Sequence, residues 1–113
     1  MNDRIGKVNE LMKRELGQII LREVEMPDQA VVTLTRVAAS GNLQQAKVYI
    51  SVVPDEKARE VLKTLGQNIF DIQQILNKKL RMRPVPKILW VLETAGAEAH
   101  RIETLLEQIR GKR

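Results

Sequence analysis

The fold of this chain is decided by one stretch, Leu43-Gln44-Gln45-Ala46-Lys47-Val48-Tyr49-Ile50-Ser51-Val52. Apolar residues occupy every second position from Ala46 to Val52, and Lys47, Tyr49 and Ser51 stand between them. A period of two predicts a β-strand with one apolar and one polar face. Other elements must cover the apolar face, and the flanking sequence supplies them.

A second strand and a long helix precede this stretch. Residues 31–37 are rich in β-branched side chains, and Ser40-Gly41-Asn42 has the composition of a turn, so the two strands are predicted to form an antiparallel hairpin. Pro27-Asp28 separates the hairpin from a helix that we expect over residues 4–23, with Asn2 or Asp3 as its N-cap. Its apolar residues recur at helical spacing: Ile5, Val8, Leu11, Met12, Leu16, Ile19 and Ile20.

Helices and a third strand follow the hairpin. Apolar residues at helical spacing continue from Pro54-Asp55 to Leu80, and a break is expected near residues 66–68, where Gly66 can end one helix and Asn68 can cap the next. Pro84 and Pro86 stop the helical pattern, and residues 87–92 predict a third strand, mostly apolar and buried on both faces. After Gly96, a last helix is predicted from the spacing of Ile102, Leu105, Leu106 and Ile109.

The predicted order is therefore α-β-β-α-α-β-α, an α+β fold with a three-stranded sheet. No internal repeat or linker divides the sequence, so we expect one domain over residues 1–113. Leu34, Val48, Ile50, Ile88, Trp90 and Leu92 give the sheet an apolar face that the helices are expected to cover. The other face carries Lys47, Tyr49 and Ser51 and is expected to be open, at least in part, to solvent or to a partner.

Composition narrows the class of protein. There is no cysteine, which removes disulfide frameworks, thiolate metal sites and cysteine nucleophiles. The N-terminal residues lack the apolar core of a signal peptide, and no apolar run is long enough to span a bilayer. The sequence predicts a soluble, cytoplasmic protein that is a monomer and needs no metal or other cofactor.

The positive charge of the chain is concentrated in one stretch. Between Asp71 and Glu93 there are five cations and no carboxylate: Lys78, Lys79, Arg81, Arg83 and Lys87. The remaining 14 basic residues balance the 14 acidic ones, so the net charge of +5 resides here. Such a stretch favours phosphate. The plainer alternative is a solvated helix end whose cations complement the helix dipole, and the residues alone leave both open for Lys78, Lys79 and Arg81.

Binding of structured RNA through phosphate and shape fits these residues better than base readout. The six glycines do not form a GxxG clamp, and an aromatic content of 3% leaves no stacking platform. Lysine and arginine contacts to phosphate remain, and these depend strongly on salt. Lys47 is a further candidate contact on its exposed strand face, where an ordinary surface role explains it equally well. Trp90, between apolar neighbours, is expected to lie in the core.

Four segments of the chain resemble the ribosome-binding factor A family of bacterial ribosome maturation factors. They are the opening amphipathic helix, the strand segment 40–52, the segment Leu80-Arg81-Met82-Arg83-Pro84-Val85-Pro86-Lys87-Ile88, and Arg101-Ile102-Glu103-Thr104-Leu105-Leu106. The resemblance implies a type II KH-like fold that binds the small ribosomal subunit late in assembly and helps to mature 16S rRNA without catalysis. It makes RNA contact the better interpretation of the cationic stretch.

The chain departs from the family pattern at the junction of the two middle helices. Where members usually have an Ala-x-Gly kink, this sequence has Asn68-Ile69-Phe70. Gly66 is expected to shift the kink, so no RNA contact is predicted there.

Two other classes of function compete with RNA binding. A catalytic or metal site around His100, with Glu98 and Glu103, lacks the spacing of a triad, a P-loop or a metal motif, so the sequence predicts no enzyme. A protein-interaction module, docking on a ribosomal protein or another assembly factor through the face around Lys47, Tyr49 and Ser51, is the alternative to RNA binding. It predicts binding that survives high salt, whereas phosphate binding falls steeply.

Overall fold

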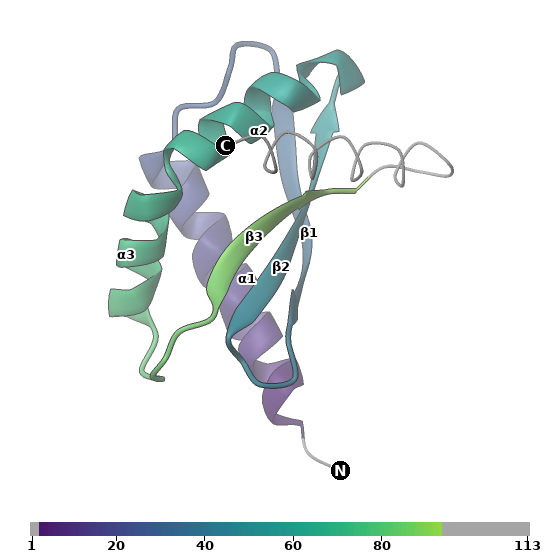
Figure 1. Cartoon of the computed structure of the whole chain (residues 1–113). Coiled ribbons are helices and arrows are strands. Elements are labelled where there is room, and N and C mark those ends of the chain that lie inside the picture. Colours follow the sequence, from purple (N-terminus) through teal and green to yellow (C-terminus); the bar gives the residue numbers. More distant parts are fainter. Residues whose placement is uncertain (1–2, 94–113) are drawn as a thin grey trace, which may run out of the picture.

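The computed structural model describes residues 3–93 and shows a three-stranded sheet with helices on one side (Figure 1). The elements in chain order are α1 (Arg4–Glu23), β1 (Val31–Ala39), β2 (Gln45–Val53), a short 3₁₀ turn η1 (Asp55–Lys57), α2 (Ala58–Gln67), α3 (Ile69–Lys79) and β3 (Lys87–Leu92). The predicted order α-β-β-α-α-β is confirmed. The predicted last helix lies outside the described residues.

The sheet has the order β1-β2-β3, with β2 in the centre. β1 and β2 form the predicted antiparallel hairpin, and β3 runs parallel to β2. A parallel neighbour requires a long crossover, which η1, α2 and α3 provide. The hairpin connection is longer than the sequence indicated. Leu43 takes a φ of 58°, and its N–H donates to the Ser40 carbonyl at 2.9 Å, so β2 begins at Gln45 and not at Leu43.

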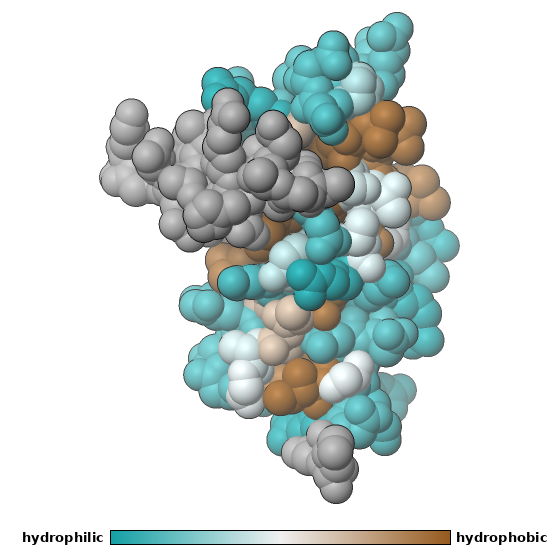
Figure 2. Space-filling model, turned by 90° about the vertical axis from the view of Figure 1, so that its right-hand side faces the viewer, coloured by the Kyte–Doolittle hydropathy of each residue, from teal (hydrophilic) through white to brown (hydrophobic). Residues whose placement is uncertain are grey.

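The core lies between the sheet and the helices, so the expectation of one covered face is confirmed. Val48 and Ile50 are fully buried on β2, and Ile88, Trp90 and Leu92 are buried beside them on β3. The helices contribute a matching apolar layer: Met12, Leu16, Val61, Leu65, Ile72 and Leu76. Among the described residues no helix is long and apolar enough to span a membrane. The side of the molecule to the right of the sheet in Figure 1 is mostly hydrophilic, with separate hydrophobic patches (Figure 2).

The break between α2 and α3 falls where it was predicted, but its residues act differently. Gly66 lies inside α2 and does not end it. Asn68 is the junction residue, with φ −98° and ψ 3°, and its side-chain amide donates backward to the Thr64 carbonyl at 2.8 Å. It therefore satisfies the C-terminal end of α2 and makes no side-chain cap on α3. Phe70, two residues on, is 70% exposed.

β1 carries a bulge that the sequence analysis did not anticipate. Leu34 pairs with Ile50 and Arg36 pairs with Tyr49, so Thr35 is an extra residue without a partner in the ladder. Without it, alternation would place Arg36 opposite Val48, on the buried face. The bulge instead turns both Thr35 and Arg36 to the face of the sheet that the described helices do not cover, and it returns Val37 to the core, where Val37 is 7% exposed.

Side-chain amides from α1 and α3 bond to individual backbone groups on the outer edges of β1 and β3. Asn9 of α1 accepts a hydrogen bond from the backbone N–H of Ala39, at 2.8 Å. On the other edge, Gln73 of α3 accepts from the Ile88 N–H at 3.0 Å and donates to the Pro86 carbonyl at 3.1 Å. Gln73 thus stands in for a neighbouring strand and fixes the segment that leads into β3.

Candidate nucleic-acid interface

The predicted contact residues lie on three connected parts of the fold. Lys78 and Lys79 end α3, Arg81 and Arg83 follow in the loop to β3, and Lys87 and Lys47 stand on β3 and β2. All six are exposed. The loop and the β1–β2 turn lie toward the same end of the molecule (Figure 1), and the Lys87 N–H donates to the Gln44 carbonyl at 3.0 Å. We call these six residues the cationic end.

The cationic end is electrostatically uncompensated within the described chain. Among residues 3–93 none of its six members forms an ion pair. Unpaired exposed cations keep their full attraction for an anionic surface and release counterions when they bind it. Unpaired cations of this kind are suited to binding phosphate and add no ion pair that would stabilise the fold of residues 3–93.

Arg83 has a second, local role. Its Nη1 donates to the carbonyls of Leu80 and Met82, at 3.0 and 2.6 Å, just beyond the end of α3. Part of the guanidinium therefore stabilises the helix terminus, which is the plainer role that cations near such a terminus can have. Arg81 has no such bond within the described residues, so of the two loop arginines it is the better placed for an external partner.

Lys87 and Lys47 lie on the face of the sheet opposite α1, α2 and α3, which the described helices do not cover. We call this the open face. Lys87 pairs with Gln45, and Lys47 is two residues farther along β2 on the same face. A strand spacing of about 4.8 Å and a two-residue rise of about 6.7 Å place their Cα atoms roughly 8 Å apart. The cationic end thus continues from the loop onto the open face.

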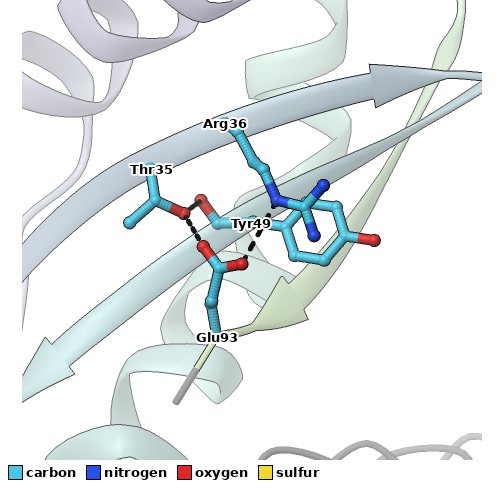
Figure 3. A network of polar contacts seen from close by, with 4 residues as sticks. All are labelled: Thr35, Arg36, Tyr49 and Glu93. Carbon is cyan, nitrogen blue, oxygen red and sulfur yellow. Dashed lines mark hydrogen bonds and ion pairs between the residues drawn. The ribbon is translucent and has the colours of Figure 1, made fainter. Parts of the chain in front are cut away.

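A network of four residues that the sequence analysis missed lies farther along this face (Figure 3). The Arg36 guanidinium carbon lies 3.8 Å from the centroid of the Tyr49 ring, and Nε donates to Glu93 Oε2 at 3.2 Å. Thr35 Oγ1 lies within hydrogen-bond distance of Glu93 Oε1 and, at 3.1 Å, of the Tyr49 carbonyl. Glu93 reaches over β2 to do this. One signal of the bulge was available in the sequence. Leu34 and Val37 are both apolar and lie three residues apart, whereas residues on one face of a regular strand lie two or four apart.

The electrostatics of this network follow from its hydrogen bonds. The hydrogen bond from the Thr35 hydroxyl is the main reason why the pKa of Glu93 lies below its usual value. Desolvation opposes this effect, and the Arg36 guanidinium lowers the pKa further by its hydrogen bond and its charge. Glu93 is therefore ionised at neutral pH, and Arg36 is held at Nε while its side chain stays 56% exposed.

Other sites find no support in the described residues. No group of histidine, cysteine, aspartate or glutamate side chains there could hold a metal ion. Trp90 is 8% exposed and belongs to the core, as predicted, and its buried Nε1 has no hydrogen-bond partner among residues 3–93. The residues considered for catalysis, around His100, lie outside the part of the chain that the structure describes.

Comparison with known proteins settles the family. The sequence model of ribosome-binding factor A matches residues 4–106. The chain belongs to the ribosome-binding factor A family. The crystal structure of ribosome-binding factor A from Thermus thermophilus superposes with a TM-score of 0.66 at 20% identity, over 78% of this chain and 93% of that one. The solution NMR structure of a Thermotoga maritima protein, a putative ribosome binding factor A by its description, gives 0.60 at 23% identity, over 83% and 87%.

A third similar structure comes from a complex of a ribosome-binding factor A with the 30S subunit. It is a homology model of the Thermus thermophilus factor fitted into a cryo-EM map of a 30S complex of that factor, with a TM-score of 0.62, 23% identity, and coverage of 74% of this chain and 88% of that one. These likenesses establish the type II KH-like fold that the resemblance implied. Within that fold, Asn68 occupies the junction where the family usually has its Ala-x-Gly kink.

Proposed function

We propose that this member of the ribosome-binding factor A family binds the small ribosomal subunit as a non-catalytic assembly factor and assists late maturation of 16S rRNA. The observation that carries the proposal is the cationic end, six exposed cations without ion pairs among residues 3–93. Family membership and the Thermus thermophilus factor fitted into a 30S map support the same partner.

The mode of binding follows from the chemistry of the cationic end. Lysine and arginine at the end of a helix, on a loop and on two strands recognise the phosphates of a folded RNA surface by position and charge, not by base identity. Tyr49 and Phe70 are the aromatic side chains outside the core in the described chain, and they lie on different elements, so no shared platform for consecutive bases is formed.

The test is co-sedimentation with purified small subunits across a salt series. Arg81→Glu/Arg83→Glu is expected to abolish binding at moderate salt while the domain stays folded by circular dichroism, because the reversal places two carboxylates against phosphate. Arg59→Glu/Lys63→Glu on α2 is the matched control, with the same change of charge on exposed residues away from the cationic end. If the folded Arg81→Glu/Arg83→Glu variant bound small subunits as tightly as the wild-type protein, the proposal would be refuted.

The protein-interaction alternative has less support. It relies on the face around Lys47, Tyr49 and Ser51, where the structure places Arg36, Thr35 and Glu93 and hence polar groups. It predicts association that persists at high salt. The same salt series separates the two, since a phosphate-bound complex loses affinity with a slope of roughly 0.7–0.9 per engaged cation on a log–log plot.

A further inference from the structure

The network at Arg36 is more elaborate than the stability of the sheet requires. An exposed ion pair contributes little to stability, and an arginine loses rotamer entropy when its side chain is ordered. Arg36 is nevertheless held at two points, by the Tyr49 ring on one face and by Glu93 at Nε. It reaches this position only because the bulge at Thr35 turns it away from the core.

What the network leaves exposed is the part of the guanidinium that recognises anions. With Nε bonded to Glu93, the two terminal nitrogens have no hydrogen-bond partner among the described residues, and they form the planar fork that binds a phosphate through two parallel bonds. In Figure 3 the guanidinium lies over the Tyr49 ring with these nitrogens directed away from Glu93. The fork is thus oriented before any ligand arrives.

Arg36 also continues a line of charge. Lys87 on β3 stands beside Lys47 on β2, and Arg36 pairs with Tyr49, two residues beyond Lys47. The strand geometry that separates Lys87 from Lys47 separates Lys47 from Arg36 by roughly the same 8 Å. Three cations therefore cross the open face diagonally, one on each strand, starting at the cationic end. A repeated anion is the ligand that such a row fits.

We propose that the open face binds an RNA strand along Lys87, Lys47 and Arg36, with the Arg36 fork holding a phosphate and Thr35, Tyr49 and Glu93 acting as positioning residues. This rests on the proposed function and extends the contact area of the cationic end, through Lys87 and Lys47, to Arg36. Glu93 has an unusual role in it, because a carboxylate that weakens the positive field also fixes the arginine on which the contact depends.

Two substitutions of Glu93 separate positioning from charge. In Glu93→Gln the amide oxygen can accept from Arg36 Nε and the amide nitrogen can donate to Thr35, so orientation is kept and a negative charge is lost. Glu93→Ala loses both. If Glu93 acts by positioning the Arg36 guanidinium, Glu93→Ala should bind small subunits about fivefold more weakly than wild type, and Glu93→Gln should bind as well as wild type or better. If Glu93 acts only through its negative charge, both variants should bind more tightly than wild type, by the same factor.

Arg36→Met supplies the independent variant, because it removes the guanidinium from an exposed position and keeps a flexible, unbranched side chain. It is expected to weaken subunit binding and to lower the salt slope by about 1, as loss of one phosphate contact does. Arg59→Met on α2 is the matched control and should leave both quantities unchanged. A photoreactive amino acid at Thr33, exposed on the open face, is expected to form an adduct with 16S rRNA.

The outcomes are distinguishable. Wild-type affinity and slope in Arg36→Met, equal tightening in both Glu93 variants, or an adduct at Thr33 with ribosomal protein alone would each overturn the open-face contact while leaving the cationic end intact. Absence of binding by the wild-type protein itself would overturn the proposed function, and this inference with it.

Discussion

Replacing Gln73 by methionine tests whether a helix side chain stands in for a strand. Gln73 bonds to the Ile88 N–H and the Pro86 carbonyl, and Ile88 is 5% exposed while Pro86 is fully buried, so water cannot readily replace the lost partners. An unsatisfied buried backbone group costs about 1–3 kcal/mol. With two groups at the low end of that range, we expect Gln73→Met to lower the free energy of unfolding by about 2 kcal/mol.

The assay is urea denaturation. With an m-value of about 2 kcal/mol/M, a loss of about 2 kcal/mol lowers the midpoint by about 1 M. Gln74→Met is the matched control, since the same substitution at an exposed neighbour on α3 should change stability by less than about 0.5 kcal/mol. Hydrogen exchange gives a local readout, because the Ile88 amide should lose protection. Equal midpoints for both variants, with unchanged exchange at Ile88, would refute the reasoning.

Two further predictions concern the site and the core. Thr35→Val should raise the pKa of Glu93 toward its usual value, since the Thr35 hydroxyl is the main cause of its depression; carboxyl NMR titration measures this, and an unchanged pKa would contradict it. Because the folded-state pKa is the lower one, the stabilisation linked to Glu93 is present above its unfolded-state pKa and is lost as pH falls through the folded value, so wild type and Thr35→Val should differ less in stability at acid pH than at neutral pH. On α1, Leu16→Ala should cost about 3 kcal/mol and Leu21→Ala less than about 0.5 kcal/mol, because Leu16 is fully buried and Leu21 is 84% exposed; equal melting temperatures for the two variants would contradict this.

Helices and strands whose apolar residues recur with a single regular period were predicted accurately from the sequence. The helix expected over residues 4–23 is Arg4–Glu23, and the third strand expected at 87–92 is Lys87–Leu92. Both are strongly periodic or bounded by proline, so local signals and burial agree. The break between α2 and α3 was also predicted, but at Gly66 and Asn68 the residue type gave the wrong mechanism, because Asn68 bonds to Thr64 and α2 continues through Gly66.

Features that depend on pairing between distant segments were not predictable from one strand at a time. The bulge in β1 is set by the register against β2, and it decides the face on which Arg36 lies. Glu93 reaches Thr35 and Arg36 over the intervening strand, across a sequence separation of 57–58 residues. The composition showed the cationic stretch at once, because five like charges are close together in sequence, whereas the Arg36 network is assembled only by the fold.

The closure of the strand edges by Asn9 and Gln73 has a consequence for self-association. An uncovered edge strand invites pairing with the edge of another copy and so promotes aggregation. Asn9 meets the edge of β1 at Ala39, and Gln73 meets that of β3 at its start, so both blocked positions lie toward the cationic end. Within the described chain, the opposite end of β1, from Val31, has no such block. A misassembled dimer or fibril of this domain would therefore begin there. Val31→Lys would place a charge at this exposed position and oppose such pairing.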